Sequence, residues 1–357
     1  MKSIKIPGYD DQFLSRECML PDHLYRYRPL VVLLGPTAVG KSRVATQVAK
    51  HFDTEILTAD SRQVYRGMDI GTDKPTTAER QGVPHRLLDM VDPHEVFNAG
   101  WYRRVALDEI DRLYAANRLP FVVGGTGLYI RTLVRGLCPA PQADPLVRAD
   151  LKKLREASGR VGLYAELMRV DPETAARLHS NDESKVMRAL EVYRLSGRSI
   201  SRIHDEHRFQ ENLFSALLIG LQRNKAALYR RIEERIDWQL THGMVEETRA
   251  LLDQGYGREL ASMKGLGYRQ VGAFLAHEYD YKEMVRRFKR DTRHFAKRQM
   301  TWFRKESGIA WLSIEESEPC ERTAERVIAL MEQFVRTLEE PAQSVALQQT
   351  MMGKGYV

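Results

Sequence analysis

One octapeptide, GPTAVGKS from Gly35 to Ser42, constrains the fold of this chain more than any other segment. It fits the pattern G-x-x-x-x-G-K-[ST] of phosphate-binding loops without a mismatch. The apolar residues 30–34 before it predict a strand, and residues 43–52 after it predict a helix. In that setting, backbone N–H groups and the positive end of the helix face a phosphate. The octapeptide predicts a phosphate site, with Lys41 on the outer phosphates and Ser42 on Mg²⁺.

Length and composition limit the class of protein. A chain of 357 residues predicts a core domain with an embedded or appended unit. No apolar run approaches the roughly 18 residues of a membrane span, and the N-terminus has no secretion signal. Cys18, Cys138 and Cys320 form no C-x-x-C pair, so we expect a reducing cytoplasm rather than a zinc site or disulfides. The net charge of +7 favours a polyanionic partner.

Alternating patterns predict an α/β core. Residues 54–58 and 119–123 read as further strands, and residues 99–117 read as a helix between them. Such alternation predicts a parallel, doubly wound sheet, which binds its ligands at the carboxyl ends of the strands. Lys41, Asp60 and Thr126 all fall at that edge. We therefore expect them in one active site.

The strand pattern then stops over about 75 residues and resumes at 214–221. A helical block between α/β strands is interpreted as an insertion, and the chain from Lys225 onward is predicted to be helical. The expected divisions are an N-terminal extension that is loosely ordered (1–29), a core with C-terminal helices (30–138 and 213–340), a helical insertion domain (139–212) and a tail (341–357).

Two features at the expected sheet edge leave alternatives open. Asp60 can bind Mg²⁺ through water or act as a general base, but Asp-Ser is equally good turn chemistry. The segment GGTG, Gly124 to Gly127, carries glycines where many phosphotransferases have an acidic residue. It indicates close approach of the backbone to a ligand, or a tight turn that needs glycine.

The predicted helix KAALYRRIEERIDWQL has a buried stripe of Leu228, Ile232 and Ile236. Arg231 and Arg235 lie four apart on another face, and two arginines on one face suit a diphosphate. From the residues alone, a solvated Arg/Glu face is the favoured interpretation.

A basic segment, 285–305, has nine Lys or Arg and one acid, Asp291, between Arg286 and Lys305. Phe288, Phe295 and Trp302 recur every seven residues and are predicted to line a seam between helices. The basic side chains then form a surface for a phosphate backbone, or a solvated basic helix.

Taken together, these segments resemble the tRNA dimethylallyltransferases (tRNA isopentenyltransferases). The resemblance follows the family order over nearly all of residues 30–312, and it rests on the stretches GPTAVGKS, ADSRQVYRGMDIGTDKP, PHRLLDMVDP, FVVGGTGLYI, ADPLVR, RLHSNDESKVMRALEVY, MKGLGYRQ and AKRQMTWFR. The C-terminus lacks the Cys/His finger of eukaryotic relatives, so the bacterial form is expected. Arg62 stands where relatives often have a small or apolar residue. The implied fold is an α/β, P-loop NTPase-like parallel sheet flanked by helices, with a helical insertion domain and a helical C-terminal region.

The resemblance implies transfer of a dimethylallyl group from dimethylallyl diphosphate to the exocyclic amine of the adenine 3′ of the anticodon. Asp60 is implied as the base for that amine, and Lys41, Thr37 and Arg235 as catalytic contacts to the diphosphate, with Mg²⁺ on Ser42. This reverses the preference for a solvated arginine face. The implied diphosphate-binding loop comprises Gly35, Pro36, Thr37, Ala38, Val39, Gly40, Lys41 and Ser42.

The implied partner is the tRNA anticodon stem-loop, gripped on one side by the helical insertion, and a monomer is expected. The target adenine must leave its stack to react. The implied tRNA contacts are Asp60, Ser61, Arg62, Gln63, Thr126, Arg148, Ser184, Lys185, Arg188, Lys264, Gly265, Gly267, Tyr268, Arg269, Lys297, Arg298, Gln299, Trp302 and Arg304.

Two rival functions share the loop and the sheet. A small-molecule phosphotransferase, such as a nucleoside kinase, needs an acceptor site but has no use for the basic helix. A regulatory NTPase that binds RNA needs an acidic residue at the strand end that here carries GGTG. The loop alone suggests ATP or GTP, whereas the combination of segments favours the diphosphate of a prenyl donor.

Overall fold

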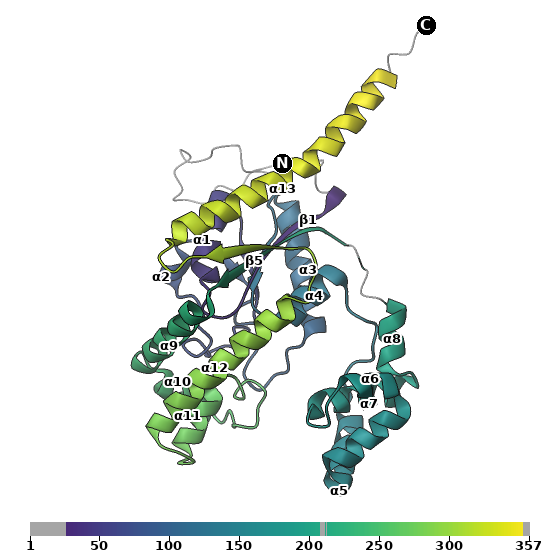
Figure 1. Cartoon of the computed structure of the whole chain (residues 1–357), viewed down its shortest axis with the longest axis vertical. Helices are drawn as coiled ribbons and strands as arrows, with labels where there is room; N and C mark the ends of the chain where they lie inside the picture. Colours follow the sequence, from purple (N-terminus) through teal and green to yellow (C-terminus); the bar gives the residue numbers. More distant parts are fainter. Residues whose placement is uncertain (1–25, 208–210, 212, 353–357) are drawn as a thin grey trace, which may run out of the picture. The chain divides into compact units, whose positions relative to one another are not determined.

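The computed structural model describes residues 26–207, 211 and 213–352, shown in Figure 1. It divides into two compact units, unit 1 extending to Val134 and resuming at Phe214, and unit 2 comprising Arg135–Leu213. Most of the expected N-terminal extension, residues 1–25, lies outside the described residues, as do residues 353–357 of the expected tail. No helix in the described part of the chain is both long and apolar enough to cross a membrane.

Unit 1 is built on a parallel sheet with the strand order β3-β2-β4-β1-β5-β6. The strands are β1 Pro29–Leu34, β2 Ile56–Ala59, β3 His85–Arg86, β4 Phe121–Gly124, β5 Ser215–Arg223 and β6 Ile309–Ile314. Every residue of β1, β2 and β4 is buried, which explains their uninterrupted apolar sequences, because a parallel sheet is covered on both faces. The α/β prediction is confirmed.

The register of the central strands places their ends side by side. Leu34 is paired with Gly124, and Gly124 with Ala59. The loops that follow β1, β2 and β4 therefore begin at the same edge of the sheet. A parallel arrangement makes this possible because all carboxyl ends point the same way.

One expectation was wrong: the chain after Lys225 is not entirely helical. Strand β6 lies at the sheet edge and pairs parallel with β5, from Leu218 opposite Ile309 to Arg223 opposite Ile314. Its sequence IAWLSI is half-buried over residues 309–312, exposed at Ser313 and buried at Ile314, unlike the fully buried central strands. The glycine at position 308, directly before the strand, was the available sequence signal for a break in the helical pattern. In the structure it adopts a φ of 80°.

The helices of unit 1 surround this sheet. They are α1 Lys41–His51, α2 Thr77–Arg80, α3 Ala99–Ala115, α4 Gly127–Arg135, α9 Lys225–Thr241, α10 Met244–Asp253, α11 Tyr268–Leu275, α12 Tyr281–Phe303 and α13 Cys320–Met352. Helix α1 packs against α13, and α9 to α12 pack on one another (Figure 1). Helix α13 continues past residue 341, where the tail was expected to begin.

Helix α12 corrects the predicted aromatic seam. Its buried row runs Met284, Phe288, Thr292, Ala296, Gln299 and Phe303. Phe288 belongs to that row and Trp302 packs partly buried against the core, but half-buried Phe295 lines a cavity instead. The straight helix repeats every 3.6 residues, so a seven-residue spacing drifts around its surface.

Unit 2 is helical, as the sequence predicted. Its helices are α5 Pro145–Val170, which is interrupted at Gly159, α6 Pro172–Arg177, α7 Glu183–Ser196 and α8 Ile200–His207. A small core of its own holds α5, α6 and α7 together, comprising Leu151, Leu163, Leu167, Ala175, Val186, Ala189 and Leu190.

Candidate active site and RNA-binding surface

A cavity of about 540 Å³ opens at the carboxyl edge of the sheet in unit 1. Its wall includes Thr37, Lys41 and Ser42 from the phosphate-binding loop, and Asp60 from the loop after β2. Glycines of the turn after β4 and side chains of α9 and α12 complete the wall. The structure therefore brings Lys41 and Asp60 together in one cavity, as the sequence predicted, whereas Thr126 does not line this cavity.

The loop between β1 and α1 requires its glycines. Gly35 and Gly40 have φ values of 153° and 112°, and a Cβ at Gly35 would lie 2.7 Å from the carbonyl oxygen of Leu221. Ala38, at φ 63°, adopts the left-handed region without being glycine. Backbone strain of this kind is common in loops that hold ligands. A side chain at Gly35 or Gly40 would therefore strain the loop.

Cationic side chains bind the carbonyl groups of this loop. The ammonium of Lys41 donates to the carbonyls of Gly35 (3.0 Å) and Pro36 (2.8 Å). Arg231 donates to Ala38 at 2.9 Å, and Arg223 donates to Val39 at 3.0 Å. Arg231 therefore supports the loop, and it also lines the cavity. With the carbonyls neutralised, the free amides at the start of α1 favour an anion.

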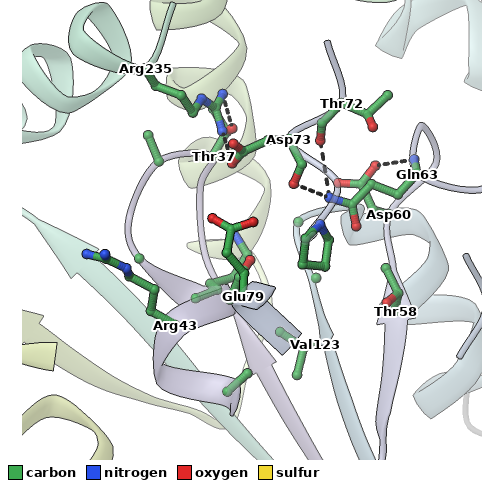
Figure 2. Close-up of a pocket in the computed structure, with 18 of the residues that line it drawn as sticks. Thr37, Arg43, Thr58, Asp60, Gln63, Thr72, Asp73, Glu79, Val123 and Arg235 are labelled. Carbon is green, nitrogen blue, oxygen red and sulfur yellow. Dashed lines mark hydrogen bonds and ion pairs between the residues drawn. The ribbon is translucent and has the colours of Figure 1, made fainter. Parts of the chain in front are cut away.

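Thr37 is held from two sides, as Figure 2 shows in part. Its hydroxyl accepts a hydrogen bond of 2.7 Å from Arg235, which also pairs with Asp73 at 2.9 Å. The backbone N–H of Thr37 donates to the side-chain oxygen of Gln299 at 2.9 Å. The Nε atom of Arg235 is buried and has no hydrogen-bond partner among the described residues. Arg235 also lines the cavity, so its positive charge lies where it favours an anion.

Burial changes the acidity of Lys41. It lowers the pKa of the ammonium from its ordinary value of 10.5 to about 8. Asp60 and Asp73 oppose this shift and Arg235 reinforces it. A diphosphate in the cavity would add negative charge and favour the protonated form. Lys41 is therefore a cation whose charge depends on the ligand beside it.

Asp60 takes part in a turn and also lines the cavity. Its Oδ1 accepts the backbone N–H groups of Arg62 (2.8 Å) and Gln63 (3.4 Å), which is turn chemistry. The side chain also lines the cavity (Figure 2). The hydrogen bonds leave Oδ2 without a hydrogen-bond partner among the described residues. The turn therefore orients a carboxylate whose second oxygen is available.

The GGTG turn makes close approaches to protein atoms, and its first two glycines also line the cavity. A Cβ at Gly124 would lie 2.1 Å from the carbonyl oxygen of Ala59. At Gly125 it would meet Gln299 at 2.6 Å, and at Gly127 it would meet Trp302 at 2.3 Å. Thr126 accepts the N–H of Ser61 at 3.0 Å. The turn thus joins β4 to the Asp60 loop and to α12.

Within the described part of the chain, acidic side chains form ion pairs with the basic residues 286–293 of α12, but not with those of its second half. Arg286 and Arg287 pair with Glu283, Lys289 with Asp237, Arg290 with Asp291, and Arg293 with Glu233. The exposed cations Lys297, Arg298, Arg304 and Lys305 have no acidic partner among the described residues, and Arg298 lies over the Phe295 ring. A polyanion would therefore meet the second half of the helix.

Two side chains among the expected tRNA contacts are buried. Tyr268 is 1% exposed and donates its hydroxyl hydrogen to Glu247 at 2.6 Å. Gln299 is 8% exposed and is bonded at both ends within the protein. Nearby, Gly265 and Gly267 are also buried, whereas Lys264 and Arg269 are exposed.

Unit 2 holds the remaining candidates. Ser184, Lys185 and Arg148 are exposed, and Arg188 is half-buried. Arg148 and Arg188 both bind the buried Glu191, at 2.8 and 2.7 Å. Burial raises the pKa of the Glu191 carboxyl, but these two arginines outweigh it, so the pKa is lowered. Glu191 thus holds Arg148 and Arg188, two of the four residues of unit 2 that are predicted to contact tRNA.

Sequence reasoning missed the residues that hold the loop 69–73 beside the cavity. Glu247 on α10 accepts the N–H groups of Asp69, Ile70 and Gly71 at 2.8 to 3.1 Å. Gln63 donates to the carbonyls of Thr72 and Asp73 (Figure 2). Asp73 lies within ADSRQVYRGMDIGTDKP, one of the stretches that carry the family resemblance, but no local pattern predicts its ion pair with Arg235.

Known proteins are similar to this chain over most of its length. The profile of a family described as IPP transferase matches residues 63–306. A tRNA dimethylallyltransferase 2 of Geotalea uraniireducens is 48% identical over 81% of this chain and 93% of its own length. A tRNA dimethylallyltransferase of Desulforudis audaxviator is 45% identical over 85% of this chain and 98% of its own length.

Solved structures extend the comparison to the fold. The full-length tRNA isopentenylpyrophosphate transferase of Bacillus halodurans is similar at a TM-score of 0.67 and 32% identity, covering 88% of this chain and 99% of that one. A eukaryotic dimethylallyltransferase acting on tRNA is similar at a TM-score of 0.72 and 26% identity, covering 87% of this chain and 80% of that one. This chain belongs to the IPP transferase family, whose named relatives are tRNA dimethylallyltransferases.

Proposed function

We propose that this protein transfers a dimethylallyl group from dimethylallyl diphosphate to the exocyclic amine of the adenine 3′-adjacent to the anticodon, at tRNA position 37. The products are N6-dimethylallyladenosine and diphosphate. One observation carries the proposal: a single cavity joins a phosphate-binding loop to a carboxylate, Asp60, on the neighbouring loop. The names of the relatives identify the donor and acceptor classes.

The phosphate-binding loop suits the leaving group. In the proposed complex, Lys41 turns from the loop carbonyls to the diphosphate, and the positive charge of Arg235 on the cavity wall stabilises it. The bond between the allylic carbon and the diphosphate oxygen breaks, and that oxygen keeps the electron pair. Fixed cations and amides in a partly buried site stabilise this developing charge. No phosphoryl group moves.

A magnesium ion fits the donor set at the start of α1. Ser42 is exposed in the cavity, and its hydroxyl has no partner among the described residues. The described residues also contain no group of three or more His, Cys, Asp or Glu that could hold a metal by themselves. Ser42 would therefore hold Mg²⁺ together with diphosphate oxygens and water. When bound, the ion would supply positive charge to the leaving diphosphate.

Asp60 suits the acceptor side of the reaction. As the adenine amine forms its bond to the allylic carbon, it loses a proton, and Oδ2 of Asp60 is positioned to accept it. The hydrogen bonds to Oδ1 hold the carboxylate in this orientation. The adenine is flipped out of the anticodon loop to reach the cavity.

The basic second half of α12 and the exposed cations Lys264 and Arg269 are proposed to bind the tRNA backbone. In unit 2, Arg148, Ser184, Lys185 and Arg188 are proposed to bind the anticodon stem-loop. Because tRNA is the substrate, we propose a cytoplasmic setting, with a monomer as the functional unit.

A direct assay separates this function from a small-molecule kinase. The protein is incubated with Mg²⁺, dimethylallyl diphosphate and tRNA from a strain that lacks the modification, and the digested nucleosides are analysed by mass spectrometry. We expect dimethylallyladenosine and diphosphate in equal amounts. Turnover of ATP without any prenylated adenosine would refute the proposal. The turn after β4, which carries glycines rather than an acidic side chain, favours the transferase.

A further inference from the structure

Gln299 connects the two loops that form the cavity. Its Oε1 accepts the N–H of Thr37 at 2.9 Å, and its Nε2 donates to the carbonyl of Gly125 at 2.9 Å. We propose that Gln299 is a positioning residue: it sets the separation between the phosphate-binding loop and the GGTG turn, and so shapes the prenyl-donor site without touching tRNA. This inference rests on the proposed function.

The GGTG turn is shaped to receive this side chain. A Cβ on Gly125 would lie 2.6 Å from Nε2 of Gln299, and a Cβ on Gly127 would lie 2.3 Å from the Trp302 ring. Residues 299 and 302 are three apart and share one face of α12. The two glycines therefore let this face of the helix contact the turn directly. The hydrogen bond from Gln299 to the Gly125 carbonyl fixes the distance between the helix and the turn.

The bond to Thr37 changes what the phosphate-binding loop offers. Gln299 occupies the backbone N–H of Thr37, so this amide is not available to a phosphate oxygen. The Thr37 hydroxyl is bound in turn by Arg235, which also pairs with Asp73. Gln299 and Arg235 thus hold Thr37 from opposite ends of the residue. If Gln299 were lost, Thr37 would be held from one end only.

Gln299 differs from its neighbours on the same helix in what it can contact. It is 8% exposed, and both ends of its amide are used within unit 1. Lys297, two residues earlier, is exposed and has no partner among the described residues. The two residues therefore provide a matched pair: one faces the donor site and the other faces the proposed tRNA surface.

The test measures binding of each substrate separately for Gln299→Met and Lys297→Met. Calorimetry with dimethylallyl diphosphate and Mg²⁺, in the absence of tRNA, gives the donor Kd, and filter binding gives the tRNA Kd. Methionine keeps the length of glutamine but loses both hydrogen bonds. For Gln299→Met we expect a donor Kd weakened about tenfold, because the phosphate-binding loop loses its link to the GGTG turn, and a tRNA Kd within about twofold of wild type. Lys297→Met should show the opposite pattern.

A second variant approaches the same contact from the other side. Gly125→Ala places a methyl group against Nε2 of Gln299, so it should also weaken donor binding while tRNA binding persists. Together the two variants keep the test decisive even if one of them folds poorly, and thermal unfolding identifies that case.

Three outcomes would overturn the inference or its basis. Weaker tRNA binding by Gln299→Met with an unchanged donor Kd would make Gln299 a tRNA contact. A lowered Tm with both Kd values unchanged would leave it a packing residue only. If the wild-type protein fails to bind dimethylallyl diphosphate at all, the proposed function fails, and this result is distinct from the other two.

Discussion

The hydroxyl of Thr37 accepts a hydrogen bond of 2.7 Å from Nη2 of Arg235, although the two residues are 198 positions apart. Arg235 lies on α9, and its other terminal nitrogen pairs with Asp73 at 2.9 Å. These two contacts hold the guanidinium at the phosphate-binding loop, where it lines the cavity.

Replacing Arg235 should therefore weaken donor binding. We expect Arg235→Ala to raise the Kd for dimethylallyl diphosphate by roughly 10- to 100-fold, because a charge-assisted contact in a partly buried site is lost. Calorimetry measures the effect. Arg230→Ala is the control, since Arg230 is exposed on the same helix and pairs with Glu316. Similar losses in both variants would contradict a specific role for Arg235.

The pKa of Lys41 predicts a pH dependence of donor binding. Because burial lowers this pKa to about 8, the ammonium is present below pH 8 and is lost as the pH rises through that value. If only the ammonium binds the diphosphate, affinity should fall up to about tenfold per pH unit above 8. Calorimetric titrations between pH 7 and 10 test this. Arginine stays protonated in this range, so Lys41→Arg should bind with little pH dependence. A flat wild-type profile would argue against Lys41 as the titrating group.

Two substitutions separate the chemistry of Asp60 from its role in the turn. Asp60→Asn keeps an oxygen that can accept from Arg62 and Gln63 but cannot act as a base. We expect kcat to fall about 10²- to 10⁴-fold while Tm and tRNA affinity persist. Asp60→Ala should lose the same activity and also stability, by about 1 kcal/mol, because the turn loses its acceptor. Single-turnover rates and thermal unfolding provide the two readouts. An asparagine variant with wild-type turnover would restrict Asp60 to the turn.

The charge distribution on α12 predicts which half of the helix controls salt dependence. The first variant replaces Lys297, Arg298 and Lys305 together by glutamine. If each of these side chains contacts a phosphate, the plot of the logarithm of the tRNA association constant against the logarithm of the salt concentration should become less steep by about 2 to 3. The control is Arg286→Gln/Arg287→Gln/Lys289→Gln, which removes three cations that already pair with Glu283 and Asp237. Its slope should change less. Equal reductions in the two variants would place the tRNA surface along the whole helix.

The sequence by itself determined the parts of this protein that depend on local order. The octapeptide Gly35–Ser42 between an apolar strand and a helix predicts its own conformation, because glycines and helix termini act within a few residues. The buried strands β1, β2 and β4 follow from apolar runs, and the helical unit 2 follows from periodicity. Order along the chain also placed Lys41 and Asp60 at one edge of the sheet, since parallel strands end together.

Only the tertiary structure decided which side chains complete the site. Arg235 and Arg231 share a face of one helix, yet one binds Thr37 and the other supports the carbonyl of Ala38. Gln299 stands among exposed basic residues, yet it is buried between Thr37 and Gly125. The edge strand β6 acquires its conformation from pairing with β5. These assignments depend on contacts between segments far apart in the chain. Such contacts produce no periodicity or spacing within a segment, so local sequence patterns cannot predict them.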